Sequence, residues 1–92
     1  MNLYVSLDAM AATLGVYRGD IAKCLKCIGV AHIPAERIPN DACDGATVKG
    51  WRVDEVVELF KRAVTNFSDT QEEYLRSRAR RSWRDVKLGV EA

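Results

Sequence analysis

The stretch AATLGVYRGDIAKCLKCIGV (residues 11–30) decides the fold, because it places a glycine–valine turn between two segments whose apolar residues recur at helical spacing. Gly15 follows the last apolar residue of the first segment, where a left-handed residue commonly ends a helix. Ala11, four residues earlier, is small enough to let a second helix cross the first closely, and Val16 can fill the angle between them. These positions together predict a helix-turn-helix.

The flanking residues supply further helix signals. Ser6 is a suitable N-cap for the first helix, and Gly29 ends the second, which begins near Tyr17 or Arg18. Asp54 can cap a third helix that carries a regular apolar face. The residues of that face are Val53, Val56, Val57, Phe60 and Val64.

Residues 30–52 have a different character, because Pro34 and Pro39 are incompatible with a continuous helix. The segments VAHI (30–33) and TVKGWRV (47–53) are rich in residues that favour strands, and turn-forming residues lie between them. This part of the chain therefore predicts two strands joined by a long loop, in the form of a hairpin.

The expected fold class is mainly α with a small β-hairpin. Residues 1–66 are expected to form one domain that contains the helix-turn-helix, the hairpin and the third helix. Residues 67–92 are expected to form a C-terminal basic helix and a frayed tail. This last helix begins at Ser68 or Thr70, because both residues fit the first position of a capping box.

The second predicted helix has a face that points away from the core, opposite Ile21 and Cys24. Small residues on that face allow close approach to a DNA groove, and cations can contact phosphates or guanine edges. The residues on or beside it are Arg18, Gly19, Ala22, Lys23 and Lys26. A helix-turn-helix is also a way of packing two helices, in which case Lys23 and Lys26 form a solvated face.

The order helix, helix, hairpin, helix over about residues 3–64 resembles the winged helix-turn-helix domains of phage excisionases, MerR-type regulators and small terminase subunits. The segments that carry this resemblance are SLDAMAATLGV, YRGDIAKCLKCIGV and GWRVDEVVELFKR. In those families the second helix enters the major groove, and the hairpin, or wing, contacts the backbone or the minor groove. By position, the resemblance implies groove contacts from Tyr17, Arg18, Gly19, Ala22, Lys23 and Lys26, and wing contacts from Arg37 and Lys49.

The predicted wing departs from the excisionase pattern in its charge. It carries Glu36, Asp41 and Asp44, whereas excisionase wings are usually more basic. These carboxylates weaken the ability of the wing to bind phosphate.

An arginine-rich segment, residues 76–87, has three interpretations. As one continuous helix it forms a phosphate-binding stripe on a single face. The residues of this stripe are Arg76, Arg80, Arg84 and Lys87. The pattern is also typical of a helix in which basic residues near the C-terminus are stabilised by the macrodipole and Glu72 pairs with Arg76. The third interpretation is a homodimer contact, for which the candidate residues are Tyr74, Leu75 and Trp83.

Four potential zinc ligands occur in order along the chain: Cys24, Cys27, His32 and Cys43. The first spacing suits zinc, but the remaining spacings match no familiar zinc module. In the helix-turn-helix Cys24 is expected to point into the core, and a free cysteine also behaves as a small apolar residue. We therefore expect no metal and no cofactor, and His32 is expected to be an ordinary hairpin residue.

The composition restricts the class of protein further. The 92 residues carry 14 Lys and Arg against 13 Asp and Glu, so a net charge of +1 does not indicate a strongly basic nucleic-acid binder. The chain shows no secretory signal or membrane-spanning run, and an odd number of cysteines predicts reduced thiols in a cytoplasm. With the resemblance to phage proteins, the expected location is the cytoplasm of a bacterial host cell or its nucleoid. No nucleophile triad, phosphate loop or paired carboxylates are evident, so we expect a non-enzyme.

Two functions follow from these patterns. The first is sequence-specific binding of double-stranded DNA by a small protein of phage or mobile-element type, as a transcription regulator, an excisionase-like factor or a packaging-recognition subunit. The second is a protein-binding module on the same scaffold, such as a phage-encoded inhibitor of a host protein complex. The nearly neutral charge and the acidic hairpin favour the second.

Overall fold

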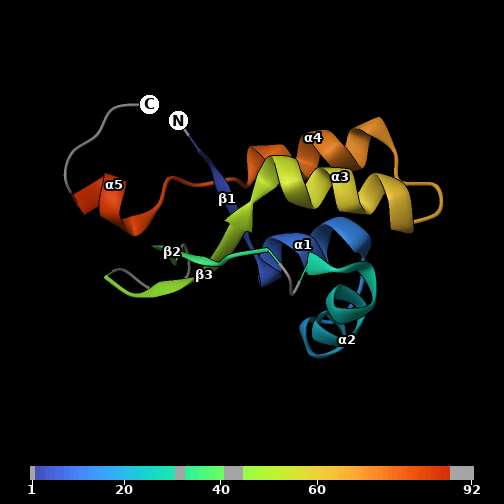
Figure 1. Ribbon diagram of the computed structural model, residues 1–92, viewed down its shortest axis with the longest axis horizontal. Coiled ribbons are helices and arrows are strands. Elements are labelled where there is room, and N and C mark those ends of the chain that lie inside the picture. Colours follow the sequence, from blue (N-terminus) through green and yellow to red (C-terminus); the bar gives the residue numbers. More distant parts are fainter. Residues whose placement is uncertain (1, 31–32, 41–44, 88–92) are drawn as a thin grey trace.

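The computed structural model describes residues 2–30, 33–40 and 45–87. Figure 1 shows the order of the elements along the chain. They are β1 (Tyr4–Ser6), α1 (Leu7–Leu14), α2 (Arg18–Ile28), β2 (Glu36–Pro39), β3 (Thr47–Arg52), α3 (Val53–Ala63), α4 (Asp69–Ser77) and α5 (Trp83–Lys87). The chain is mainly helical with a small antiparallel sheet, which confirms this part of the prediction.

A side-chain cap and a left-handed glycine set the two ends of α1 where the sequence places them. The hydroxyl of Ser6 accepts a hydrogen bond from the backbone N–H of Ala9 at 3.2 Å and so caps α1. Gly15 ends α1 in the left-handed conformation with φ of 69°. The N–H groups of Gly15 and Val16 both donate to the carbonyl of Ala11, which closes the turn before α2.

Substituting valine for Gly15 is expected to destabilise the protein by at least about 1 kcal/mol, because a β-branched residue resists a positive φ. A Cβ atom at this position would meet no atom within 4 Å, so the loss comes from the backbone and not from a clash. Gly19→Val is the matched control, since Gly19 also faces open space but lies within α2 without a positive φ. Thermal unfolding followed by circular dichroism measures both variants, and an unchanged melting temperature for Gly15→Val would contradict the turn.

The sheet has the strand order β1-β3-β2, and both pairings are antiparallel. β1 was not predicted, and the first hairpin strand is β2 instead of the predicted segment 30–33, of which residues 31–32 lie outside the described part. Pro39 is compatible with β2 because this strand lies at the edge of the sheet. Gly50 occupies the central strand, where a Cβ atom would lie 2.9 Å from the Cδ1 atom of Ile38.

Helix α3 follows β3 without a loop. It begins at Val53 with Arg52 as the N-cap, and the N–H of Val53 donates to the carbonyl of Leu3 at 3.0 Å. The prediction that Asp54 caps this helix is therefore wrong, because the β-strand pairing carries the chain into the helix and leaves Asp54 in its first turn. The predicted apolar face is confirmed for Val53, Val56, Val57 and Phe60, which are buried. Val64 lies just after the helix as its C-cap and is half-buried.

Helix α4 is joined to the rest of the molecule at both of its ends. Ser68 and Gln71 form the predicted capping box, and the amide of Gln71 also donates to the carbonyl of Thr13 in α1 at 3.1 Å. Leu75 is fully buried in the same apolar core as Met10 and Phe60. The C-terminal region therefore packs into the core formed by the preceding elements.

The continuous helix predicted for residues 76–87 is wrong. Helix α4 ends at Ser77, and the backbone of Arg80 then pairs with that of Tyr4 through two hydrogen bonds of 2.7 and 2.8 Å. This pairing extends the chain along β1 before α5 begins at Trp83, at the end of the molecule away from α2 (Figure 1). The expected frayed tail after Lys87 lies outside the described residues.

Candidate nucleic-acid interface

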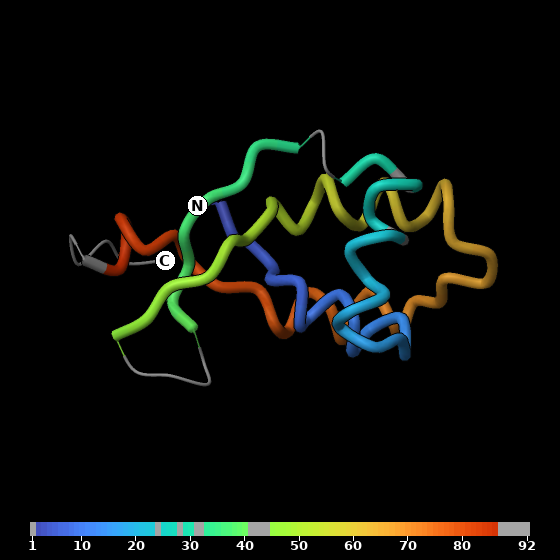
Figure 2. Tube along the Cα trace, turned by 90° about the horizontal axis from the view of Figure 1, so that it is seen from below, coloured from blue at the N-terminus to red at the C-terminus, as the bar shows by residue number. Residues whose placement is uncertain are grey.

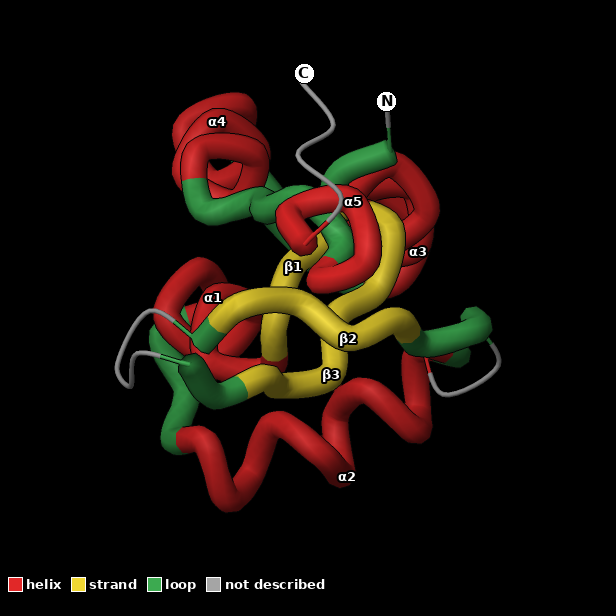
Figure 3. Tube along the Cα trace, turned by 90° about the vertical axis from the view of Figure 1, so that its left-hand side faces the viewer, coloured by secondary structure: helices red, strands yellow, loops and turns green. Residues whose placement is uncertain are grey.

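Helix α2 is the outermost element on one side of the molecule, and Figure 3 shows it crossing beneath the sheet. Its inner side is fixed by Ile21 and Leu25, which are buried in the core. The residues exposed on its outer side are Gly19, Ala22, Lys23 and Lys26. No ion pair among the described residues involves either lysine. The outward face therefore combines small side chains with two available cations.

The start of α2 adds an aromatic residue and a third cation. Tyr17 is 84% exposed and immediately precedes the helix. The Nε atom of Arg18 lies 3.1 Å from the Oδ1 atom of Asp8, and both side chains are well exposed. An exposed ion pair of this kind contributes little free energy, so a phosphate can replace the carboxylate at small cost.

A surface hollow connects the start of α2 to the β2–β3 hairpin. Arg18 and Lys49 both line this hollow, which has a volume of about 230 Å³. Lys49 is also the cross-strand partner of Arg37, and these two residues line the next hollow along the hairpin. Arg37 donates a hydrogen bond from Nη1 to the hydroxyl of Thr47 at 2.7 Å, which holds its side chain along the strands. We call Arg18, Lys49 and Arg37 the basic path.

Carboxylates lie close to the basic path. Of the three acidic residues predicted for the wing, Glu36 in β2 lies in the described part of the chain. Its Oε1 atom lies 4.0 Å from Arg84 of α5. Arg84 thus partly neutralises the hairpin and lies beside it, although the sequence suggested a separate basic stripe. Asp8, which was not among the residues predicted for the site, lines the hollow with Arg18. Asp41 and Asp44 lie outside the described residues.

Arg76 belongs to a different surface, where α3 and α4 meet. Its guanidinium lies 2.7 Å from Asp54 and 3.0 Å from Glu72, which confirms the predicted pair of Glu72 and Arg76. Glu72 also pairs with Lys61 at 3.0 Å. Hydrogen bonds from Lys61 and Arg76 lower the pKa of Glu72, and those to Asp54 and Glu72 raise the pKa of Arg76. Arg76, which was predicted to contact DNA, therefore already pairs with the carboxylates of Asp54 and Glu72.

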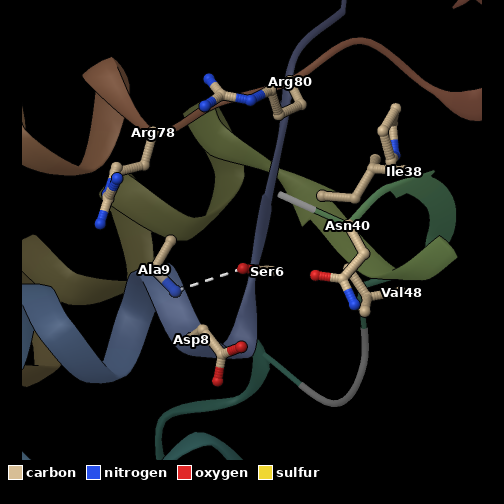
Figure 4. Close-up of a pocket in the computed structure, with 9 residues that line it drawn as sticks. Ser6, Asp8, Ala9, Ile38, Asn40, Val48, Arg78 and Arg80 are labelled. Atoms are coloured by element: carbon tan, nitrogen blue, oxygen red, sulfur yellow. Dashed lines mark hydrogen bonds between the residues drawn. The ribbon is translucent and has the colours of Figure 1, made fainter. Parts of the chain in front are cut away.

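Arg80 lines a pocket next to the hollow of Arg18 and Lys49, and the two share Ser6, Asp8 and Val48 as lining residues. The pocket has a volume of about 140 Å³, and Figure 4 shows Arg78 and Arg80 on one side of it with Ile38, Asn40 and Val48 on another. Arg80 is half-buried there. The structure therefore does not bring Arg76 and Arg80 onto one stripe, because Arg76 pairs with Asp54 where α3 and α4 meet, whereas the pocket of Arg80 adjoins the hollow at the start of α2.

One of the three residues predicted for a homodimer contact is buried within the chain. Leu75 has no exposed surface, so it is unavailable to a second copy of the chain. Tyr74 is 40% exposed and lies 5.5 Å from the guanidinium carbon of Arg78, measured to the ring centre. Trp83 is half-buried at the start of α5.

The structure describes only part of the set of potential zinc ligands. Cys27 is exposed with a free thiol. His32, Cys43 and the side chain of Cys24 lie outside the described part of the chain. Within the described part, no three metal-ligating side chains cluster. The absence of a metal remains a prediction.

No protein-family model, no curated protein and no solved structure matches this chain. Within residues 2–30, 33–40 and 45–87, no helix has the length and apolar character needed to cross a membrane. The function is therefore inferred from the chain's own surface, where α2 and the hairpin provide the best-defined candidate site.

Proposed function

We propose that this chain is a small sequence-specific DNA-binding protein of phage or mobile-element type. In this proposal α1, α2, the β2–β3 hairpin and α3 act as a winged helix-turn-helix. Helix α2 enters the major groove, and the hairpin contacts the backbone or the minor groove. Such a protein can serve as a transcription regulator, an excisionase-like factor or a packaging-recognition subunit.

The observation that carries the proposal is the exposed outer face of α2 and its continuity with the basic path. Gly19 and Ala22 allow the helix backbone to approach base edges, and Lys23 and Lys26 lie beside them without a described carboxylate partner. The hollow shared by Arg18 and Lys49 extends this surface to the hairpin. Cations from two elements can thus contact one duplex.

The dependence of DNA affinity on salt tests this proposal. If Lys23, Lys26 and the three cations of the basic path each contact one phosphate, the logarithm of the association constant falls with the logarithm of salt concentration with a slope of about −4.5. Electrophoretic mobility shift of random duplex DNA over a salt series measures the slope. A protein that shifts no DNA at micromolar concentration, or one whose affinity is independent of salt, would contradict the proposal.

The second candidate function is a protein-binding module on the same scaffold, such as a phage-encoded inhibitor of a host protein complex. Two observations favour it: the net charge of only +1, and the exposed carboxylates Asp54, Glu55 and Glu58 on α3. This function takes precedence if the mobility-shift experiment detects no DNA binding.

A further inference from the structure

A second surface, separate from the outer face of α2, has an apolar floor and an acidic rim. It is a groove of about 450 Å³ that α3 forms with Gly29, at the end of α2, and with Ile33. Figure 2 shows the described residues that lead into β2 running beside the first turns of α3. The residues that line the groove are Gly29, Ile33, Asp54, Glu55, Glu58 and Leu59. We call this surface the acidic groove.

The floor of the acidic groove is apolar surface that the core leaves partly uncovered. Ile33 and Leu59 pack against the core but are only half-buried, whereas Val56 and Phe60 in the same helix are fully buried. Gly29 contributes no side chain, and a Cβ atom there would lie 3.9 Å from the Cδ2 atom of Leu59. The groove therefore offers a contact site for aliphatic side chains.

The rim of the groove carries free negative charge. Asp54 is paired with Arg76, but no ion pair among the described residues involves Glu55 or Glu58. These two exposed carboxylates are three residues apart on one helix, so they lie on the same side of α3. The helix macrodipole stabilises acidic side chains in the first turn, which explains the presence of Asp54 and Glu55. It does not explain Glu58, which lies in the second turn.

We propose that the acidic groove binds a basic segment of a partner protein. One or two aliphatic side chains of that segment lie on Ile33 and Leu59, and flanking lysine or arginine side chains pair with Glu55 and Glu58. The charge of the rim selects this occupant, because the same carboxylates repel nucleic acid. Gly29 ends α2 and Arg18 begins it, so the groove lies at the opposite end of this helix from Arg18 of the basic path.

Calorimetric titration of the full chain with a short helical peptide of leucine and lysine tests the proposal. We expect saturable binding that weakens by about tenfold in the double variant Glu55→Gln/Glu58→Gln, as two charge pairs are lost. The matched control is Asp69→Asn/Glu73→Gln, which also removes one first-turn and one second-turn acid but on α4, away from the groove. This control is expected to change the affinity by less than about twofold.

The peptide sequence supplies the remaining controls. A peptide of alanine and lysine with equal charge is expected to bind at least about tenfold more weakly, because it lacks the side chains that cover the floor. Equal weakening in the two double variants, no weakening in either, no binding of the leucine peptide, or equal binding of the alanine peptide would each overturn the proposal. So would a dimer in analytical ultracentrifugation that dissociates in Glu55→Gln/Glu58→Gln, because the occupant would then be a second copy.

Discussion

Replacing Leu75 by alanine is expected to lower the free energy of unfolding by about 2–5 kcal/mol. Leu75 has no exposed surface and belongs to the core that also contains Met10 and Phe60. Truncation removes apolar contacts and leaves a cavity that the surrounding helices cannot fully close. A small domain has a total stability of about 5–15 kcal/mol, so the loss is a large share of it. Denaturant unfolding followed by tryptophan fluorescence measures the change.

The neighbouring substitution Tyr74→Ala is the control. Tyr74 is partly exposed, and its described ring contact is with Arg78, so the expected loss is at most about 1 kcal/mol. The wild-type protein should also unfold in one cooperative transition, because α4 shares its core with α1 and α3. Two separate transitions, or a Leu75→Ala variant as stable as the wild type, would show that residues 67–92 form an independent unit.

Reversing the charge of Lys23 and Lys26 together is expected to weaken DNA binding by at least about tenfold. Replacement by glutamate removes two contacts with phosphates or bases and adds repulsion from the duplex. Both side chains are exposed and lack a described ion pair, so the fold should change in stability by no more than about 0.5 kcal/mol. Fluorescence anisotropy with a labelled duplex measures affinity, and circular dichroism measures stability.

Single variants provide a matched comparison for this experiment. Lys26 and Arg62 are both exposed and lie in the last turn of an 11-residue helix, so glutamate at either position has a similar effect on the helix itself. Lys26→Glu should weaken DNA binding clearly more than Arg62→Glu does. If Arg84→Glu abolishes binding while the Lys23 and Lys26 variant retains it, α2 is not the element that contacts DNA.

The parts of the fold that were predicted correctly are those determined by neighbouring residues. Ser6 and Ser68 cap their helices through groups three residues away, and Gly15 ends α1 by its own conformation. Such signals can be read from a few consecutive residues. The buried face of α3 is equally local, because it follows from helical periodicity.

The parts that were missed depend on residues far apart in the sequence. β1 exists because Val5 pairs with Trp51, and the pairing of Tyr4 with Arg80 interrupts the arginine-rich segment. The spacing of Arg76, Arg80 and Arg84 is compatible with one helix, and nothing in that spacing reveals the competing strand partner. The position of β2 likewise follows from its register with β3.

The candidate site also has one part that follows from local sequence and another that depends on residues far apart in the chain. The exposed face of α2, with Lys23 and Lys26, follows from helical periodicity once Ile21 is assigned to the core. The pair of Asp8 with Arg18 and the two carboxylates around Arg76 come from other elements. The acidic groove also joins residues from two separate segments, so no single stretch of sequence indicates it.

Amide chemical-shift mapping of the full chain with an unlabelled DNA duplex tests most directly whether α2 contacts DNA. The predicted result is that the largest shifts occur at residues 17–26 of the turn and α2, with a second group at Arg37 and Lys49 of the hairpin. Asp54, Glu55, Glu58 and Leu59 of α3, which line the acidic groove, should shift little. Shifts confined to the arginine-rich residues 78–87, or no shifts at DNA concentrations that saturate other binders of this size, would contradict recognition of DNA by α2.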